Sequence, residues 1–256
     1  MSANNLAGRK ALVTGGARGI GAAIAEALAN AGASVMIGDI LADLGKDTAG
    51  RLAKTGAKTG FVELNVSDDA QWEKAVAATI ATLGGYDILI NNAGIAHSAP
   101  LARITLEDWN RVLAVNATGT FLCTQAFLPR MLERKRGSVV NVASVAGLAG
   151  ARYIAAYAAA KHAVIGFTRS VAAEIEGTGV TCNAVCPGYV DTEMTRESVA
   201  RVVAKTGKAT DEALQAMLVA SGQSRLITPT EVAQAVLALC DPGGERVNGA
   251  AITISG

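Results

Sequence analysis

In KALVTGGARGIG, residues 10–21, a short apolar run ends in a cluster of glycines that leads into a helical pattern. The pattern predicts a strand over 10–15 and a helix over 20–31. Glycines at such a junction let the backbone turn sharply and approach a pyrophosphate, which then meets the positive N-terminus of the helix. The spacing G-x-x-x-G-x-G differs from the more familiar G-x-G-x-x-G, so its place between strand and helix carries the interpretation as a dinucleotide-binding loop. The loop residues expected to contact a cofactor are Gly15, Arg18, Gly19, Ile20 and Gly21.

The alternation of strand and helix continues along all 256 residues. Further strands are predicted at 34–39, 59–66, 86–92, 137–144, 179–188 and 249–255, and helices at 42–54, 68–83, 107–134 and 155–176, with another opened by TPTE at 228–231. Ser67 is the expected N-cap of the helix at 68–83. Repeated βα units imply parallel strands with right-handed crossovers, and nearly continuous apolar strands imply helices on both faces. We predict an α/β fold: a single doubly wound Rossmann-type domain over 1–256, built on a parallel seven-stranded sheet.

The segment from about 191 to 223 interrupts this alternation, although ESVARVVAKTG and DEALQAMLVASG have helical patterns. A long insertion between a strand and the next regular helix is a candidate substrate lid.

Composition restricts the classes of function. Hydrophobic residues make up 50% of the chain, charged residues 18%, and the formal net charge is +1. These values exclude global disorder and give no electrostatic case for nucleic acid or an anionic membrane. The four cysteines show no C-x-x-C pair and no histidine at metal spacing, so we expect buried thiols in a reducing cytoplasm and no metal. The polar start MSANNLAGRK is no secretory signal, and no uninterrupted apolar stretch reaches transmembrane length.

Two charged residues bear on the choice of cofactor. Asp39 ends the second predicted strand, where a carboxylate can accept both ribose hydroxyls of an adenosine and would repel a 2′-phosphate. Arg18, in the glycine loop, has the opposite tendency, because a guanidinium can bind a 2′-phosphate. The carboxylate would sit against the phosphate while Arg18 can turn to solvent, so NAD is preferred over NADP. Asp39 could instead simply cap the next helix.

Two further patterns lie where catalysis would be expected. NNAG at 91–94 ends the fourth strand, and carboxamides with a small-residue bend suit the ligand crevice at the carboxyl edge of an open sheet. Tyr157 and Lys161 are four residues apart on a predicted helix and therefore share one face, with Ser144 upstream. The set supplies a phenol for proton exchange, a cation that favours its ionised form and a hydroxyl that can hold a carbonyl oxygen.

Together these motifs resemble the short-chain dehydrogenase/reductase family in its classical form, and the match covers nearly the whole chain. It rests on T-G-x-x-x-G-I-G at 14–21, N-N-A-G at 91–94, Asn116 within VLAVNATGTF, Ser144, Y-x-x-x-K at 157–161 and P-G-x-V-x-T at 187–192. The resemblance implies the strand order 3-2-1-4-5-6-7 and a homotetramer built partly from the two long helices. It also implies an oxidoreductase that moves a hydride between a nicotinamide cofactor and a secondary alcohol or ketone.

The resemblance further implies roles for single residues. Tyr157 would be the acid and base, and Lys161 would lower its pKa and bind a ribose. Ser144 would orient the substrate oxygen, and Asn116 would hold a water in a proton relay. The remaining residues implied in the cofactor site are Asn92, Ala93 and Gly94 at a ribose, Pro187, Gly188, Val190 and Thr192 at the nicotinamide, and Asn65 and Val66 at the adenine. Asn65-Val66 stands where many members have Asp-Val, and its carboxamide can still accept a bond from the adenine amine.

The lid segment resembles that of D-3-hydroxybutyrate dehydrogenases, but the predicted pocket departs from theirs. Ala96, Ala146 and Ile154 stand where those enzymes have glutamine, histidine and lysine. A buried carboxylate without a cationic partner is costly, so a bulkier, less charged ketone such as a 3-oxoacyl thioester of coenzyme A, or a cyclic or aryl alcohol, is favoured over free 3-hydroxybutyrate. Further substrate candidates are His97, Arg152 and Tyr189, with surface positions as the alternative for the first two.

Two rival functions stay open. An NADPH-dependent 3-oxoacyl carrier-protein reductase would use Arg18 and the basic cluster of Arg130, Arg134, Lys135 and Arg136, which otherwise complements the end of a helix. A catalytically inactive family member that serves as a binding or structural subunit is opposed by the intact set of Asn116, Ser144, Tyr157 and Lys161.

Overall fold

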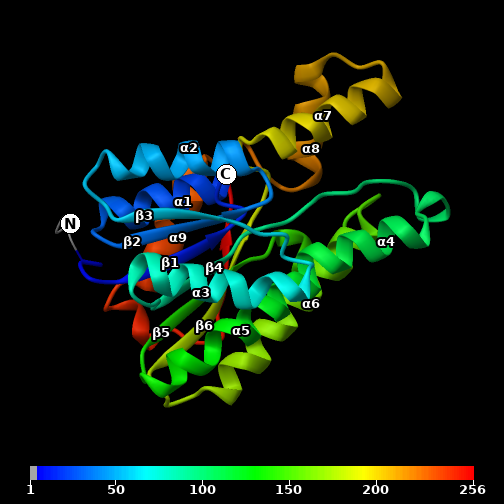
Figure 1. The fold of residues 1–256 in the computed structure, drawn as a ribbon. Coiled ribbons are helices and arrows are strands. Elements are labelled where there is room, and N and C mark those ends of the chain that lie inside the picture. Colours follow the sequence, from blue (N-terminus) through cyan, green and yellow to red (C-terminus); the bar gives the residue numbers. More distant parts are fainter. Residues whose placement is uncertain (1–4) are drawn as a thin grey trace.

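The computed structural model describes residues 5–256, in which seven parallel strands form one sheet with helices on both faces (Figure 1). The strands are β1 (Lys10–Thr14), β2 (Ser34–Asp39), β3 (Thr59–Glu63), β4 (Ile88–Asn91), β5 (Gly137–Val142), β6 (Val180–Pro187) and β7 (Ala251–Ile254). The helices are α1 (Gly19–Asn30), α2 (Ala42–Ala53), α3 (Trp72–Leu83), α4 (Leu106–Leu113), α5 (Gly119–Glu133), α6 (Ala155–Glu174), α7 (Glu193–Thr206), α8 (Thr210–Ala220) and α9 (Pro229–Cys240). The strand order is β3-β2-β1-β4-β5-β6-β7 with every pair parallel, which confirms the predicted fold class and order.

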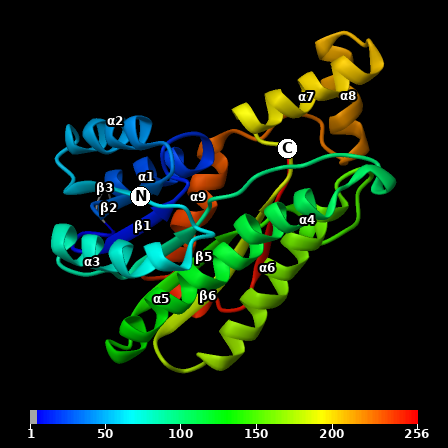
Figure 2. The same ribbon diagram turned by 45° about the vertical axis from the view of Figure 1, so that its right-hand side comes forward.

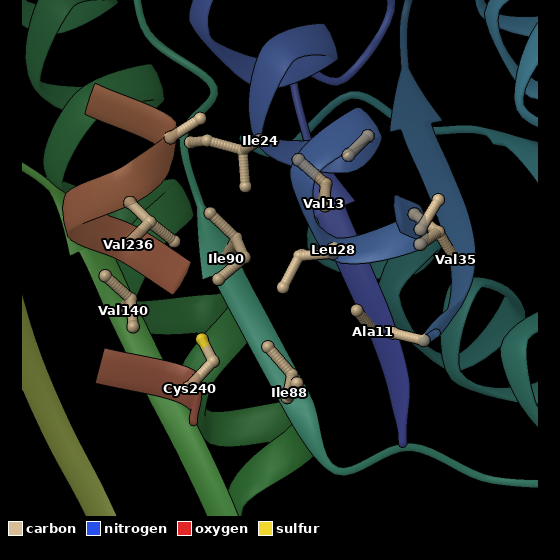
Figure 3. Close-up of a cluster of buried hydrophobic side chains, with 14 of the residues drawn as sticks. Ala11, Val13, Ile24, Leu28, Val35, Ile88, Ile90, Val140, Val236 and Cys240 are labelled. Carbon is tan, nitrogen blue, oxygen red and sulfur yellow. The ribbon is translucent and has the colours of Figure 1, made fainter. Parts of the chain in front are cut away.

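The strands divide their side chains between two cores. Ala11 and Val13 of β1 face one core, together with Ile88 and Ile90 of β4, whereas the intervening residues of both strands face the other. The first core lies under α1, α2 and α9, and Figure 3 shows Ile24 and Leu28 of α1 and Val236 of α9 above the strands. The second lies under α3, α5 and α6. Strands covered on both faces need apolar residues at successive positions, which explains the nearly continuous apolar runs.

Several boundaries differ from the prediction. β3 ends at Glu63 instead of 66, because the Asn65 N–H donates to the side chain of Gln71 at 2.8 Å and the chain leaves the sheet. Asp68, not Ser67, caps the following turn: its carboxylate accepts from the Ala70 N–H at 3.1 Å. The helix predicted over 107–134 starts one residue earlier and is interrupted by a π-helical turn over Ala114–Thr118.

The helix that starts after TPTE has the expected cap. The Thr228 hydroxyl accepts from the Glu231 N–H, and the Glu231 carboxylate accepts from the Thr228 N–H at 2.8 Å, which completes a capping box. Pro229 occupies the first turn, where a missing N–H costs nothing.

The segment predicted as a lid forms α7 and α8, which project from one edge of the sheet in both views (Figures 1 and 2).

The combined helix Leu106–Glu133 is long and apolar enough to cross a membrane by length and composition alone, which differs from the expectation that no such stretch exists. Its polar residues Asn116, Thr120 and Thr124 are buried and bonded within the fold, and α5 packs on β4 and β5. One face of the helix is therefore packed into the fold, and 39% of its most apolar 18-residue window is buried.

Candidate active site

The predicted site residues gather at the carboxyl edge of the sheet, where β1, β2, β4, β5 and β6 end. Loops from neighbouring parallel strands meet at this edge, which is the ligand crevice of open α/β folds. Ser144 follows β5, Asn92 follows β4 and Gly188 follows β6. Residues distant in sequence are therefore brought together by the strand order.

Hydrogen bonds hold the glycine loop against the end of β4. The Thr14 hydroxyl donates to the Ile90 carbonyl at 3.2 Å and accepts from the N–H groups of Asn92 and Ala93 at 3.0 and 3.1 Å. The Asn92 side-chain N–H₂ donates to the carbonyls of Thr14 and Gly15, both at 3.0 Å. A Cβ on Gly21 would lie 2.1 Å from the Gly15 carbonyl oxygen, so only glycine fits there. Both side-chain N–H groups of Asn92 are therefore engaged by the glycine loop.

The start of α1 fits the pyrophosphate of a dinucleotide. The side chain of the N-cap residue Arg18 makes no capping bond to the first turn of α1. Gly19 has φ +57° and no side chain to cover the N–H groups of this turn, and an added Cβ would only touch Thr192 at 3.6 Å. Uncapped donors at a helix N-terminus bind anions.

Asp39 and Arg18 occupy different environments beside this loop. The buried Asp39 carboxylate accepts from the N–H groups of Ala17 at 2.9 Å and Leu41 at 3.0 Å, so it stays at the end of β2 next to the glycine loop. The Arg18 guanidinium donates to the carboxylate of Glu193, the first residue of α7. Sequence reasoning missed this partner, which is exposed like Arg18 itself.

Ser144, Tyr157 and Lys161 lie together, as the spacing predicts. The Ser144 hydroxyl lies close enough to Tyr157 to lower the pKa of that phenol. The Ser144 hydroxyl also accepts from the Ala146 N–H at 3.1 Å and donates to the Pro187 carbonyl at 3.3 Å. The Lys161 ammonium donates to the Val142 carbonyl at 2.8 Å and lies 5.7 Å from the centre of the Tyr157 ring.

Burial dominates the acidity of these groups in the ligand-free protein. It raises the pKa of Tyr157 above its usual value, and the Ser144 hydroxyl opposes this rise. It lowers the pKa of Lys161 to about 8. The predicted lowering of the phenol pKa by Lys161 is not seen in the ligand-free protein, where burial and Tyr189 raise the pKa of Tyr157 and only Ser144 lowers it. A further positive charge beside the phenol would favour its ionised form.

Asn116 lies in the π-helical turn that interrupts the long helix. Its side chain pairs with the backbone of Ile95: Oδ1 accepts from the N–H at 2.8 Å and Nδ2 donates to the carbonyl at 2.9 Å. A Cβ on Gly94 would lie 3.1 Å from Asn116 Oδ1 and 3.7 Å from Lys161 Nζ, so the three residues converge. π-Turns often occur at functional sites because they redirect one side chain out of the helical register.

The two ends of the predicted cofactor site are also ordered by side-chain contacts. At the adenine end, Asn65 Oδ1 already accepts two bonds from Ser67, at 3.1 and 2.8 Å, and Val66 is buried against Gly119. At the nicotinamide end, the segment of Pro187, Gly188, Tyr189, Val190 and Thr192 leads from β6 into α7, and Gln223, which sequence reasoning missed, bonds its backbone.

The substrate candidates lie on the segments that follow β4, β5 and β6 and on the loop that precedes α6. Ala146 is buried, Ala96 and Ile154 are half-buried, and Tyr189 is close enough to Tyr157 for its charge to oppose ionisation of that phenol, which raises the pKa of Tyr157. The Ala99 N–H donates to the Tyr153 carbonyl at 2.8 Å, which joins the loop after β4 to the loop before α6.

His97 and Arg152 differ from the apolar candidates. His97 directs Nε2 toward Asp108, 3.6 Å away in α4, and its buried Nδ1 has no hydrogen-bond partner within residues 5–256. The side chain of Arg152 is exposed on the loop before α6.

The basic cluster lies away from the site. Arg134 and Arg136 pair with the buried Asp87 at 3.4 and 3.7 Å, and the Asp87 carboxylate also accepts from the Lys10 N–H at 3.1 Å. Asp87 precedes β4 and Arg136 precedes β5, so the cluster is at the amino edge, opposite the crevice. The arrangement agrees with the structural alternative for these arginines.

Comparisons with known proteins find one matching family and several relatives of this chain. The family model of the short chain dehydrogenases matches residues 9–202. A 3-oxoacyl-(acyl-carrier-protein) reductase FabG of Aquifex aeolicus is 38% identical over 98% of this chain and 97% of its own length. A 3-alpha-(or 20-beta)-hydroxysteroid dehydrogenase of Mycobacterium bovis is 43% identical over 74% of this chain and 72% of its own. A D-beta-hydroxybutyrate dehydrogenase of Cupriavidus necator is 36% identical over 98% of both chains. Among solved structures, a point variant of the actinorhodin polyketide ketoreductase with NADPH superposes with a TM-score of 0.92, at 34% identity, covering 99% of this chain and 98% of its own.

The fold and the edge site define a Rossmann-type oxidoreductase that uses a nicotinamide cofactor. The chain belongs to the short-chain dehydrogenase family, and it moves a hydride between that cofactor and a secondary alcohol or ketone. The resemblance found in the sequence is confirmed.

Proposed function

We propose that the protein is an NAD-preferring dehydrogenase of a bulky, weakly charged secondary alcohol, such as a 3-hydroxyacyl thioester of coenzyme A or a cyclic or aryl alcohol, and that it also catalyses the reverse reduction. The observation that carries the proposal is the Ser144, Tyr157 and Lys161 group beside a glycine loop whose neighbouring carboxylate is Asp39.

The side chains divide the proton chemistry between them. The Ser144 hydroxyl holds the substrate oxygen, and the Tyr157 phenolate takes the hydroxyl proton during oxidation and returns it during reduction. Lys161 binds the ribose of the cofactor, and Asn116 holds a water that connects Lys161 to solvent. When bound, the nicotinamide accepts the hydride and contributes a positive charge in its oxidised form. This charge supports the ionised phenol that burial alone disfavours.

The preference for NAD rests on charge. Asp39 stands at the end of β2, where the adenosine ribose binds in this fold, and a 2′-phosphate would meet its carboxylate. Arg18 is paired with Glu193 and so is engaged elsewhere. Steady-state titration with both cofactors tests the preference, and a several-hundred-fold higher kcat/KM with NADP would refute it.

The runner-up is an NADPH-dependent 3-oxoacyl carrier-protein reductase. The FabG relative and the ketoreductase with NADPH favour it. The pairing of Arg18 with Glu193, and of Arg134 and Arg136 with Asp87, argues against it. A catalytically inactive subunit is the alternative of another class, and detectable NAD-dependent turnover would exclude it.

The substrate class follows from the pocket. Ala96, Ala146 and Ile154 provide apolar surface, and Arg152, an available cation near them, is exposed to solvent. A small carboxylate would lose hydration there without gaining a buried partner. Initial rates with NAD over hydroxyacyl thioesters, cyclic alcohols, aryl carbinols and free 3-hydroxybutyrate test this; highest kcat/KM with the free acid would contradict it.

α7 and α8 form the proposed substrate lid, over about 191–223 within one dinucleotide-binding and catalytic domain.

We also propose a homotetramer in which a second copy covers α5 and α6. Phe121 of α5 is 42% exposed and packs edge-to-face on Phe167 of α6, which is half-buried against the second core, so Phe121 is the member of the pair that a second copy could cover. Light scattering should give four times the chain mass of 26.0 kDa.

The four buried, unpaired cysteines support a reducing, cytoplasmic location, which cell fractionation would test.

A further inference from the structure

Gln223 is a buried carboxamide at the exit from α8, with only 6% of the residue exposed. Oε1 accepts from the Tyr189 N–H at 2.7 Å and from the Ser221 hydroxyl at 3.0 Å. Nε2 donates to the carbonyls of Tyr189 and Arg225, both at 3.2 Å. Two acceptor sites and two donors are the full capacity of a carboxamide, so the side chain is held in one orientation.

Gly188 leaves the space that the carboxamide of Gln223 occupies. A Cβ on Gly188 would lie 2.3 Å from Gln223 Oε1 and 2.6 Å from its carboxamide carbon. The three nearest atoms to that hypothetical Cβ all belong to Gln223, and Gly188 does not have a positive φ. Glycine is therefore required at 188 because the carboxamide fills the space that a side chain would need.

Backbone bonds extend the contact into a short strap. The Ile227 N–H donates to the Tyr189 carbonyl at 3.0 Å, and the Asp191 N–H donates to the Ile227 carbonyl at 2.8 Å. Val190 and Ile227 pair as a parallel bridge. The entrance and the exit of the α7–α8 segment are thus joined at the carboxyl end of β6.

Asn116 makes the same kind of contact with a second loop. Its carboxamide pairs with both the backbone N–H and the backbone carbonyl of Ile95. Each carboxamide pairs with the N–H and the carbonyl of a single residue. Such pairing fixes a loop without placing a net charge near the ligand.

We infer that Gln223 is a positioning residue for the nicotinamide end of the cofactor. It holds the peptide groups of Gly188 and Tyr189, and through them Val190 and Thr192, in the geometry that seats the nicotinamide. The inference rests on the proposed function, because it takes these last two residues as nicotinamide contacts. The adenosine end depends on different residues, around Asp39 and the glycine loop.

The test compares NAD with ADP-ribose, which lacks the nicotinamide, by calorimetry on the full chain. Gln223→Leu keeps the approximate side-chain size and removes all four hydrogen bonds. We expect the dissociation constant of NAD to rise at least about tenfold, because the net contribution of one to two hydrogen bonds is lost. The dissociation constant of ADP-ribose should change less than about twofold. kcat should fall as well. Gln215→Leu, on the exposed face of α8, is the matched control and should bind both ligands as the wild type does.

A second variant approaches the contact from the other side. Gly188→Ala should displace the carboxamide and reproduce the selective loss of NAD binding. In the Gln223→Ser background, which leaves room for the new methyl group, Gly188→Ala should add little further loss. Two outcomes would overturn the positioning role. One is that these variants weaken the binding of NAD and ADP-ribose equally; the other is that they lower the unfolding midpoint but leave NAD binding unchanged. Failure of the wild type to bind ADP-ribose would instead refute the proposed cofactor site.

Discussion

Replacing Lys161 with methionine should stabilise the ligand-free protein while it abolishes turnover. Lys161 is 5% exposed, and burial lowers its pKa from 10.5 to about 8. At 1.36 kcal/mol per unit, holding the ammonium in this site costs about 3 kcal/mol at pH 7. Methionine keeps the aliphatic stem but leaves the Val142 carbonyl without its donor, which costs about 1 kcal/mol. We therefore expect Lys161→Met to raise the free energy of unfolding by about 2 kcal/mol at pH 7.

The pH dependence separates this effect from ordinary packing. The folded-state pKa lies below the unfolded value, so the unfolded chain binds more protons between about pH 8 and 10.5. The wild type should therefore gain stability, relative to the variant, as the pH rises through that window. The advantage of Lys161→Met should be largest below pH 8 and should vanish near pH 10. Above about pH 10.5 the variant should be the less stable protein by about 1 kcal/mol, because only the loss of the bond to the Val142 carbonyl remains. Taking the difference between the two proteins cancels the ionisation of other groups, such as the buried cysteines.

Urea unfolding of the ligand-free proteins at several pH values measures the difference. Lys205→Met, which alters an exposed lysine on α7, is the control and should show neither the stabilisation nor the pH trend. Parallel stability curves for the wild type and Lys161→Met between about pH 7 and 10 would refute the reasoning, because a desolvated ammonium must titrate in that window.

Three further variants test separate parts of the site. Tyr157→Phe should lower kcat by at least about 100-fold and leave NAD affinity within a few-fold, and turnover close to that of the wild type would overturn the assigned proton chemistry. Glu193→Gln should release Arg18 and raise kcat/KM with NADP relative to NAD by up to about fivefold, the worth of an exposed ion pair; an unchanged ratio would show that Glu193 does not restrain the guanidinium. Thr228→Ala should lower the free energy of unfolding by about 1 kcal/mol in urea melts through loss of the α9 cap, with activity retained.

The sequence predicts the fold well because its signals are local. Each strand is a short apolar run, and the turn after β1 carries a glycine with φ +61° at position 15 and another at position 21, where a Cβ would meet the Gly15 carbonyl. The Ser144, Tyr157 and Lys161 group was predictable because i and i+4 positions share a helix face and because the carboxyl ends of parallel strands meet.

Contacts between distant segments were beyond such reasoning. The partner of Arg18 is 175 residues away, and the partner of Gln223 lies 34 residues back along the chain. Nothing in ASGQSR distinguishes Gln223 from an exposed lid residue. The π-turn at 114–118 was missed for a related reason: the helical pattern continues through it, and the Asn116 side chain within it bonds to Ile95, which lies 21 residues back along the chain.

The carboxamides at the crevice show why residue type alone does not assign a role. Sequence patterns associate Asn92 and Asn116 with ligands, yet in the ligand-free protein their N–H₂ groups donate to backbone carbonyls of neighbouring loops. Gln223 binds the backbone of Tyr189 in the same way. A neutral group with two donors and an acceptor can fix a loop inside a low-dielectric crevice without the electrostatic penalty of a buried charge. Lys161 is the buried cation among these crevice residues, and its ammonium lies 5.7 Å from the centre of the Tyr157 ring.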